Sequence, residues 1–244
     1  MEVSEEVAAQ LESLGIRRGR YELEPIRHIH KVIAGRLTDA ARDTPTFPLT
    51  IDIGIDSLLA LRTEYNTANS ARVSVNDLMI RASALALVQV PGVNASFTAH
   101  GLVRHRHADV AMAVGTSSGL ITPIIWSAEE KTAVQISTEA RDLAERARAR
   151  RLKPDEYMGG TFSVSNLGMF GIKSFGSIIN PPHAAILSVG AARPTVVPMA
   201  GEIRVATLMS VTLTCDHRVV DGILGANWLN AFRGFIEQPS QLFT

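Results

Sequence analysis

The 244-residue chain carries 24 basic and 24 acidic side chains, so its formal charge is zero and no global field favours nucleic acid or an anionic membrane as a partner. Hydrophobic residues make up 46% of the sequence, enough for one large core and a single main domain. The only cysteine, Cys215, excludes an internal disulfide and a cysteine-rich metal site. The apolar runs are far shorter than the roughly 20 residues of a membrane span, and the acidic amino terminus does not resemble a secretory signal. We therefore expect a cytoplasmic protein.

The first 90 residues are predicted to be mainly helical. Residues 1–20 hold a short amphipathic segment and a turn, and we treat them as an N-terminal leader segment ahead of one domain over residues 21–244. Within that domain, apolar residues repeat every 3.6 positions in three stretches, whereas one stretch alternates with period two. The pattern predicts helices over 26–44, 56–65 and 74–90, and a strand over 47–55.

From residue 95 onward, short apolar runs are separated by Gly, Ser and Pro, which is typical of a sheet. A charged amphipathic segment over 132–152 predicts a helix with a solvated polar face, and a closing helix is expected over 223–236. The expected strands are 95–98, 108–114, 120–126, 161–165, 184–189, 203–206 and 209–214. Helices and strands are intermixed, which favours the α/β class.

The strand expected over 209–214 leads into a cluster of titratable residues at 215–218. Histidine has an ordinary pKa of about 6.5, so His217 at a strand end is suited to moving protons at neutral pH. A structural histidine satisfied by hydrogen bonds fits the same position. Asp221 lies four residues later and either orients the histidine or holds the loop through an arginine; the spacing favours neither role.

Several separated motifs resemble one enzyme family. The run Asp216-His217-Arg218-Val219-Val220-Asp221-Gly222 matches the signature of the dihydrolipoamide acyltransferases of 2-oxo acid dehydrogenase complexes. Three more blocks agree with that family in order and spacing: Gly119–Ile124, Gly159–Gly171 and Ile178–Pro182. The resemblance covers residues 21–244 and is nearest to the pyruvate dehydrogenase acetyltransferases.

The resemblance implies a chloramphenicol-acetyltransferase-like fold, a mixed sheet with flanking helices, which forms trimers with active sites between subunits. It assigns His217 the removal of the proton from the thiol of coenzyme A, so that the thiolate attacks an acyl group, most simply acetyl, on a dihydrolipoyl group. It assigns Ser165 of the neighbouring subunit a hydrogen bond to the tetrahedral oxyanion, and Asp221 the support of the histidine loop. From the residues alone, Ser165 equally fits a strand hydroxyl bonded to backbone.

The same resemblance implies substrates and partners. Coenzyme A is one substrate, and the dihydrolipoyl group is carried on another domain or chain, because this sequence holds no lipoylation motif and no Ala/Pro-rich linker. The expected partners are a lipoyl carrier domain and the decarboxylase and dihydrolipoamide dehydrogenase components, in the bacterial cytoplasm or the mitochondrial matrix. Family trimers build cubic or icosahedral cores through carboxy-terminal contacts. Leu242 and Phe243 are candidate anchors for such contacts, or else they dock onto their own domain.

Other conspicuous residues have weaker roles. The cluster at 105–107 lacks a third ligand at a suitable spacing, so we expect exposed turn histidines and no metal. The segment 169–172 either lines a substrate channel or packs in a trimer contact. Two positions depart from the family pattern: His30 replaces an arginine, and Thr46 replaces a frequent histidine. Since neither is His217 or Ser165, we expect retained catalysis with an altered rate or acyl preference.

Two other functions fit the sequence. One is a non-catalytic core subunit whose role is assembly, favoured by the two departures and by the missing carrier. The other is a standalone coenzyme A acyltransferase with an alcohol or amine acceptor. The presence of both His217 and Ser165 favours an enzyme.

Overall fold

The computed structural model describes residues 4–26, 28–117, 119–199 and 201–244. The chain divides into two compact units, Met1–Arg36 and Leu37–Thr244. In the first unit, the segment expected to be amphipathic is helix α1 (Glu5–Ser13). Ser4 caps this helix, because its hydroxyl oxygen accepts a hydrogen bond from a backbone N–H of the first turn. The next helix, α2, spans His28–Asp43, close to the expected 26–44.

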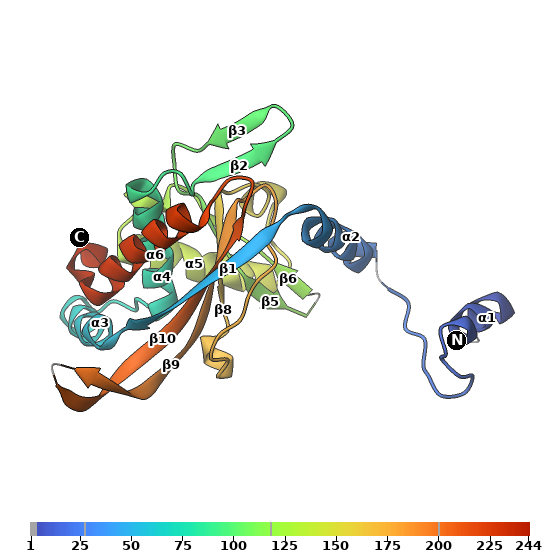
Figure 1. Ribbon diagram of the computed structural model, residues 1–244, viewed down its shortest axis with the longest axis horizontal. Helices are drawn as coiled ribbons and strands as arrows, with labels where there is room; N and C mark the ends of the chain where they lie inside the picture. The colour runs from blue at the N-terminus through green and yellow to red at the C-terminus, as the bar shows by residue number, and fades with distance from the viewer. Residues whose placement is uncertain (1–3, 27, 118, 200) are drawn as a thin grey trace. The chain divides into compact units, whose positions relative to one another are not determined.

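The second unit is built around a six-stranded mixed sheet (Figure 1). The strand order is β1-β10-β9-β8-β4-β7, with bounds Thr46–Gly54, Glu202–Asp216, Ala185–Met199, Phe162–Asn166, Val110–Met112 and Ile124–Ile125. β10 is antiparallel to both β1 and β9, whereas β8 runs parallel to β9 and β4. The expected α/β class with a mixed sheet is confirmed.

Helices flank this sheet. They are α3 (Asp56–Asn69), α4 (Val75–Gln89), α5 (Ala133–Arg148) and α6 (Gly222–Glu237). α4 contacts α5, α6, β4 and β8, and α6 contacts β1 and β10 (Figure 1). Within the described residues, no helix combines the length and the apolar character that crossing a bilayer requires.

α6 packs into the core between helices and sheet, and its buried residues recur at helical spacing. Its Trp228 ring lies 5.0 Å from Phe162 of β8 and 5.4 Å from Phe232, measured between ring centroids. Full burial of such a side chain contributes about 1.5–3 kcal/mol. This packing fixes α6, and with it the loop that precedes α6.

Five strand predictions are wrong in detail. The expected 184–189 is only the first part of the longer strand β9. The expected 108–114 is divided into β4 and β5 (Val114–Thr116), and the expected 120–126 into β6 (Gly119–Ile121) and β7, because β5 and β6 pair only with each other. The expected 203–206 and 209–214 are one strand, β10, which continues through a register shift between Met209 and Val211. The remaining elements are the hairpin of β2 (Ala95–Thr98) and β3 (Gly101–Arg104), and four 3₁₀ turns, η1 (Ala128–Glu130), η2 (Pro154–Glu156), η3 (Gly168–Phe170) and η4 (Pro239–Phe243).

The segment from 171 to 180 runs against the sheet near this register shift. At Gly190 of β9, an added Cβ would lie 1.9 Å from the backbone carbonyl oxygen of Lys173, so only glycine admits the segment here. The Ala191 N–H donates to the Ile172 carbonyl at 2.7 Å. We call residues 171–180 the strap.

The carboxy-terminal tail docks onto its own domain. Leu242 is fully buried in the core cluster, and the Phe243 ring lies 4.8 Å from the Tyr65 ring of α3. Arg81 of α4 donates from Nη2 to the Thr244 carbonyl oxygen at 2.8 Å. Of the two expectations for this tail, the structure therefore supports docking within the chain.

We expect Leu242→Ala to lower the free energy of unfolding by about 2–4 kcal/mol, because it leaves a cavity beneath the tail. Chemical denaturation measures the loss. Val88→Ala, at an exposed position of α4, is the control and should change stability by less than about 0.5 kcal/mol. Equal effects of the two substitutions would contradict the docked tail.

Candidate active site

The histidine loop, residues 216–222, begins where the pair of β1 and β10 ends. Thr46 is the register partner of Asp216, and the next N–H, that of His217, donates to the Pro45 carbonyl at 2.9 Å. The N–H groups of Val219 and Val220 then donate to the Asp216 carbonyl at 3.0 and 2.9 Å, which closes a tight turn. His217 is therefore carried by a short loop with a fixed backbone.

The His217 side chain is exposed and rests on an aromatic ring. Its imidazole lies 4.7 Å from the Phe47 ring of β1 between centroids, with a 47° angle between the ring planes. Phe47 is the register partner of Cys215, so β1 positions the histidine directly. This contact could not be predicted from sequence, because it joins residues 170 positions apart.

An ion pair inside the loop holds its backbone. The Asp216 carboxylate is buried and accepts hydrogen bonds from Arg218 Nη2 at 2.7 Å, from Nε at 3.0 Å and from the Arg218 N–H at 3.0 Å. The hydrogen bond to Asp216 raises the pKa of the Arg218 guanidinium above its ordinary range. Arg218 also donates to the Asp43 carbonyl at 3.2 Å.

Asp221 closes the loop by capping α6. Its Oδ1 accepts a hydrogen bond from the Leu224 N–H at 2.8 Å, the geometry of an N-cap residue. Of the two sequence hypotheses for Asp221, the arginine partner is not observed, since Arg218 pairs with Asp216. In the described chain Asp221 supports the loop through the helix start and is not hydrogen-bonded to His217.

Ser165 lies in β8, in a row of hydroxyl residues that crosses the sheet in register. The row continues with Ser188 of β9, Thr212 of β10 and Thr50 of β1. Ser188 is bonded to Ser177 of the strap at 2.7 Å between hydroxyl oxygens, and Thr212 to Thr50 at 2.9 Å. Among the described residues the Ser165 hydroxyl alone in this row has no partner, so it is available to an incoming group.

A single chain does not bring Ser165 to His217. Ser165 is level with Thr212, which precedes His217 by five positions on β10. Strand geometry separates those positions by roughly 16 Å along the strand direction, well beyond hydrogen-bonding distance. Within one chain the two side chains therefore do not form a common site.

Cys215, the only cysteine, lies two positions before His217 in the sequence, but its side chain faces the core. It is fully buried, and this burial, together with the negative charge of Asp216, raises its pKa to about 12. Because the thiolate is the reactive form, Cys215 is inert at neutral pH. It is therefore not a nucleophile of this site.

Two other histidines, His183 and His107, have structural partners. Buried His183 bonds to Ser163 Oγ and to the Gly159 carbonyl, both at 2.9 Å, and burial lowers its pKa. His107 Nδ1 lies 2.9 Å from Glu129, with Glu130 at 3.6 Å, a group that could hold a metal ion. Both Glu129 oxygens are already bonded, one to His107 and one to the Ala108 N–H, so the fold accounts for this cluster without an ion. The side chains of His28 and His30 lie outside the described residues.

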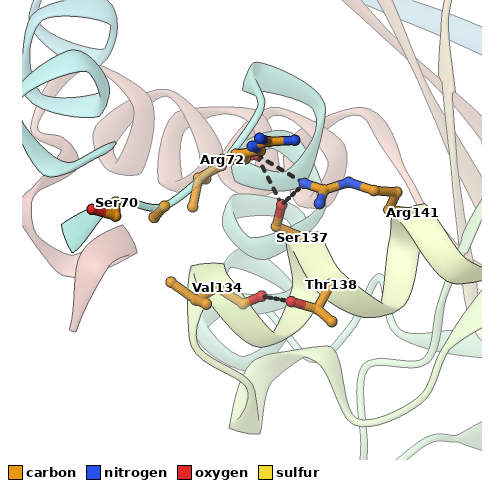
Figure 2. Close-up of a pocket in the computed structure, with 8 residues that line it drawn as sticks. Ser70, Arg72, Val134, Ser137, Thr138 and Arg141 are labelled. Carbon is orange, nitrogen blue, oxygen red and sulfur yellow. Dashed lines mark hydrogen bonds between the residues drawn. The ribbon is translucent and has the colours of Figure 1, made fainter. Parts of the chain in front are cut away.

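A pocket of about 230 Å³ lies between α5 and the segment that joins α3 to α4 (Figure 2). Its polar groups are bonded to each other: Ser137 Oγ donates to the Arg72 carbonyl at 3.1 Å, and Arg141 approaches the same carbonyl at 3.4 Å. Thr138 donates to the Val134 carbonyl within α5. These hydrogen bonds tie α5 to the neighbouring segment. The pocket shares no lining residue with the histidine loop.

The model of the 2-oxoacid dehydrogenases acyltransferase family (catalytic domain) matches residues 18–244. The chain belongs to this family. It is 48% identical over 228 residues to the dihydrolipoyllysine-residue acetyltransferase component of the pyruvate dehydrogenase complex of Rhizobium meliloti, covering 91% of this chain and 51% of that protein. The chain thus spans about half the length of that curated relative.

Solved structures of the acyltransferase family have the same fold. The dihydrolipoamide acetyltransferase of Azotobacter vinelandii superimposes with a TM-score of 0.88 at 27% identity, covering 93% of this chain and 96% of that one. Chloramphenicol acetyltransferase, at 13% identity, gives a TM-score of 0.54 over 86% of this chain and 96% of that one. The expected chloramphenicol-acetyltransferase-like fold of this family member is confirmed.

We expect Cys215 of this acyltransferase domain to resist a thiol-reactive reagent at about pH 8, because a thiol whose pKa is about 12 stays protonated there. In denaturant the pKa returns to its ordinary value of about 8.5, and labelling should be complete. Mass spectrometry counts the label in both states. Rapid labelling of the folded protein would contradict the buried position.

Proposed function

We propose that the chain transfers an acyl group between a dihydrolipoyl-lysine and coenzyme A, as the catalytic core of a pyruvate dehydrogenase complex. The names of the curated relatives favour acetyl as that group. The observation that carries the proposal is the exposed His217, held on Phe47 at the end of β10 by a loop whose backbone is fixed. The acetyltransferase component from Rhizobium meliloti supports the choice of reaction.

The chemistry follows from these groups. Neutral His217 accepts the proton of the coenzyme A thiol, and the thiolate attacks the thioester carbonyl carbon of the acetyl-dihydrolipoyl group. The carbonyl oxygen becomes an oxyanion, to which the unpaired Ser165 hydroxyl donates a hydrogen bond. When the carbon–sulfur bond to the dihydrolipoyl group breaks, the leaving thiolate takes the proton back from His217. Acetyl-coenzyme A and a dihydrolipoyl thiol result, with no net proton change at the histidine.

Residue spacing supports these roles. The structure of the Azotobacter vinelandii acetyltransferase was used to study three residues in the catalytic mechanism. They are a serine, a histidine 52 positions later, and an asparagine 4 positions after the histidine. Ser165, His217 and Asp221 have the same two spacings. Asp221 takes the place of the asparagine, and both residue types cap helices well.

The site is proposed to form between subunits of a trimer. Within one chain, Ser165 and His217 are separated by roughly 16 Å along the strand direction. This separation favours an arrangement in which His217 of one copy faces Ser165 of a neighbouring copy. Three copies arranged head to tail close the ring and give three equivalent sites. The dihydrolipoyl group would arrive on a lipoyl carrier domain, charged by the decarboxylase component and reoxidised by dihydrolipoamide dehydrogenase.

Steady-state transfer from acetyl-coenzyme A to free dihydrolipoamide tests the reaction. Turnover that His217→Ala abolishes supports it. No turnover by the wild type, together with incorporation into a catalytic partner's particles, would favour an assembly subunit instead. Turnover only with an alcohol or amine acceptor would favour the standalone enzyme.

We expect co-expression of His217→Ala with Ser165→Ala to give activity well above that of either variant alone. Ser165→Ala alone should lower kcat by about 10²–10³-fold, the usual loss for one oxyanion donor. In randomly mixed trimers, about a quarter of the interfaces join an intact histidine to an intact serine, so activity should reach about a quarter of the wild type. No recovery would place both residues in sites within one chain.

We expect Asp221→Asn to keep kcat within a few-fold of wild type, because the amide oxygen can accept the same bond from the Leu224 N–H. Asp221→Ala should cost about 1 kcal/mol of stability through the lost cap. Denaturation and steady-state kinetics measure the two effects. A large loss of kcat in Asp221→Asn without a loss of stability would show that the carboxylate charge acts on His217.

A further inference from the structure

Two arginines line the pocket between α5 and the segment that joins α3 to α4. Arg72 belongs to that segment, and Arg141 lies on α5. Their side chains point toward one another from the two walls (Figure 2). The other lining residues are two serines, a threonine, an alanine and two valines, so none of the residues described around this pocket is acidic. The pocket therefore has two cationic side chains and no carboxylate of its own.

Most hydrogen-bond donors of these two arginines are unused. A guanidinium group has five N–H donors. Arg141 places one nitrogen, Nη2, 3.4 Å from the Arg72 carbonyl oxygen and 3.5 Å from Ser137 Oγ, and both distances are long for such a bond. The Arg72 guanidinium makes no hydrogen bond to any residue that the structure describes. Free charged donors are therefore available at this pocket.

No carboxylate forms an ion pair with either arginine in the part of the chain that the structure describes. Two of the three acidic residues on α5 are paired with other cations, Glu139 with Lys131 and Asp142 with Arg146. The third, Glu145, forms no ion pair with Arg141. At the start of α4, the Asp77 carboxylate accepts the Ser74 N–H at 2.7 Å in the capping box. The two guanidinium groups are therefore open to an anion from solution.

The size and the charge of the pocket indicate the class of ligand. Its volume of about 230 Å³ is below the roughly 300–1,000 Å³ of sites for drug-sized ligands, which favours a compact group over a whole coenzyme A molecule. A phosphoryl group carries a charge of about −1.5 to −2 and has three acceptor oxygens, so it matches two guanidinium groups better than a singly charged carboxylate does. The N-cap of α4, Ser74, directly follows the lining segment, and the partial positive charge of that helix end favours the same anion.

We propose that this pocket binds the phosphoryl group of a small phosphorylated molecule, held between Arg72 and Arg141. Arginine suits this role because its planar fork donates two parallel hydrogen bonds to phosphate oxygens. A phosphoryl group held here bridges α5 and the segment that leads into α4, so its binding raises the melting temperature of the chain. Because the pocket shares no lining residue with the histidine loop, the inference goes beyond the proposed reaction and does not rest on it.

Equilibrium dialysis of the full chain against radiolabelled inorganic phosphate tests the proposal, at constant ionic strength in chloride. We expect one phosphate per chain, with a Kd of about 1 mM or below, and a higher melting temperature when the site is filled. Arg72→Gln and Arg141→Gln should each weaken binding about tenfold, because each removes one charged fork. Arg141→Lys keeps the charge without the fork and should bind between the wild type and Arg141→Gln. Arg148→Gln is the matched control, since Arg148 is also an exposed arginine of α5 but does not line the pocket, and its phosphate binding should equal that of the wild type.

Binding that does not saturate at one phosphate per chain would overturn the proposal. Unchanged binding in both Arg72→Gln and Arg141→Gln would also overturn it, since the phosphate would then lie elsewhere. Acetate tests the choice of anion: if an equal concentration of acetate displaces the labelled phosphate, the pocket does not select a phosphoryl group. Both arginines are exposed, so the variants should fold, and circular dichroism checks this. None of these measurements uses acetyl transfer, so failure of the proposed function leaves the test of this pocket intact.

Discussion

The antiparallel pairing of β1 with β10 determines where the histidine loop lies. β10 leaves the sheet after Asp216, and the His217 N–H is bonded to Pro45, just ahead of β1. α6 packs so closely on this pair that a Cβ at Gly225 would lie 2.7 Å from a Leu49 methyl group. The loop is therefore short, and the core fixes it at both ends.

Arg218 extends this rigidity outward from the loop. Its guanidinium is shared between the buried Asp216 carboxylate, the Asp43 carbonyl at the end of α2 and the face of Phe97. A bidentate pair with one buried partner is stronger than an exposed ion pair, because water competes less for the carboxylate. One side chain thus couples the end of a helix, the histidine loop and the hairpin of β2 and β3.

Much of the local structure could be predicted from the sequence, because amphipathic period and capping are local signals. Helices α3 to α6 and the position of His217 at a strand end follow from such signals. The continuation of β9 to Met199 could not be predicted, since Gly190 and two prolines interrupt its pattern and only pairing with β10 makes it a strand. The contact of Phe47 with His217 and the bond of Ser177 to Ser188 were missed for the same reason: residues distant in sequence meet only in the fold.

The buried Cys215 has a consequence for chemical compatibility. The proposed function would bring the chain into contact with a dithiol and its cyclic disulfide, which exchange readily with any accessible thiolate. With a pKa of about 12 and no exposed surface, the Cys215 sulfur cannot attack such a disulfide. The one thiol of the chain therefore lies next to the histidine loop without being open to mixed-disulfide formation.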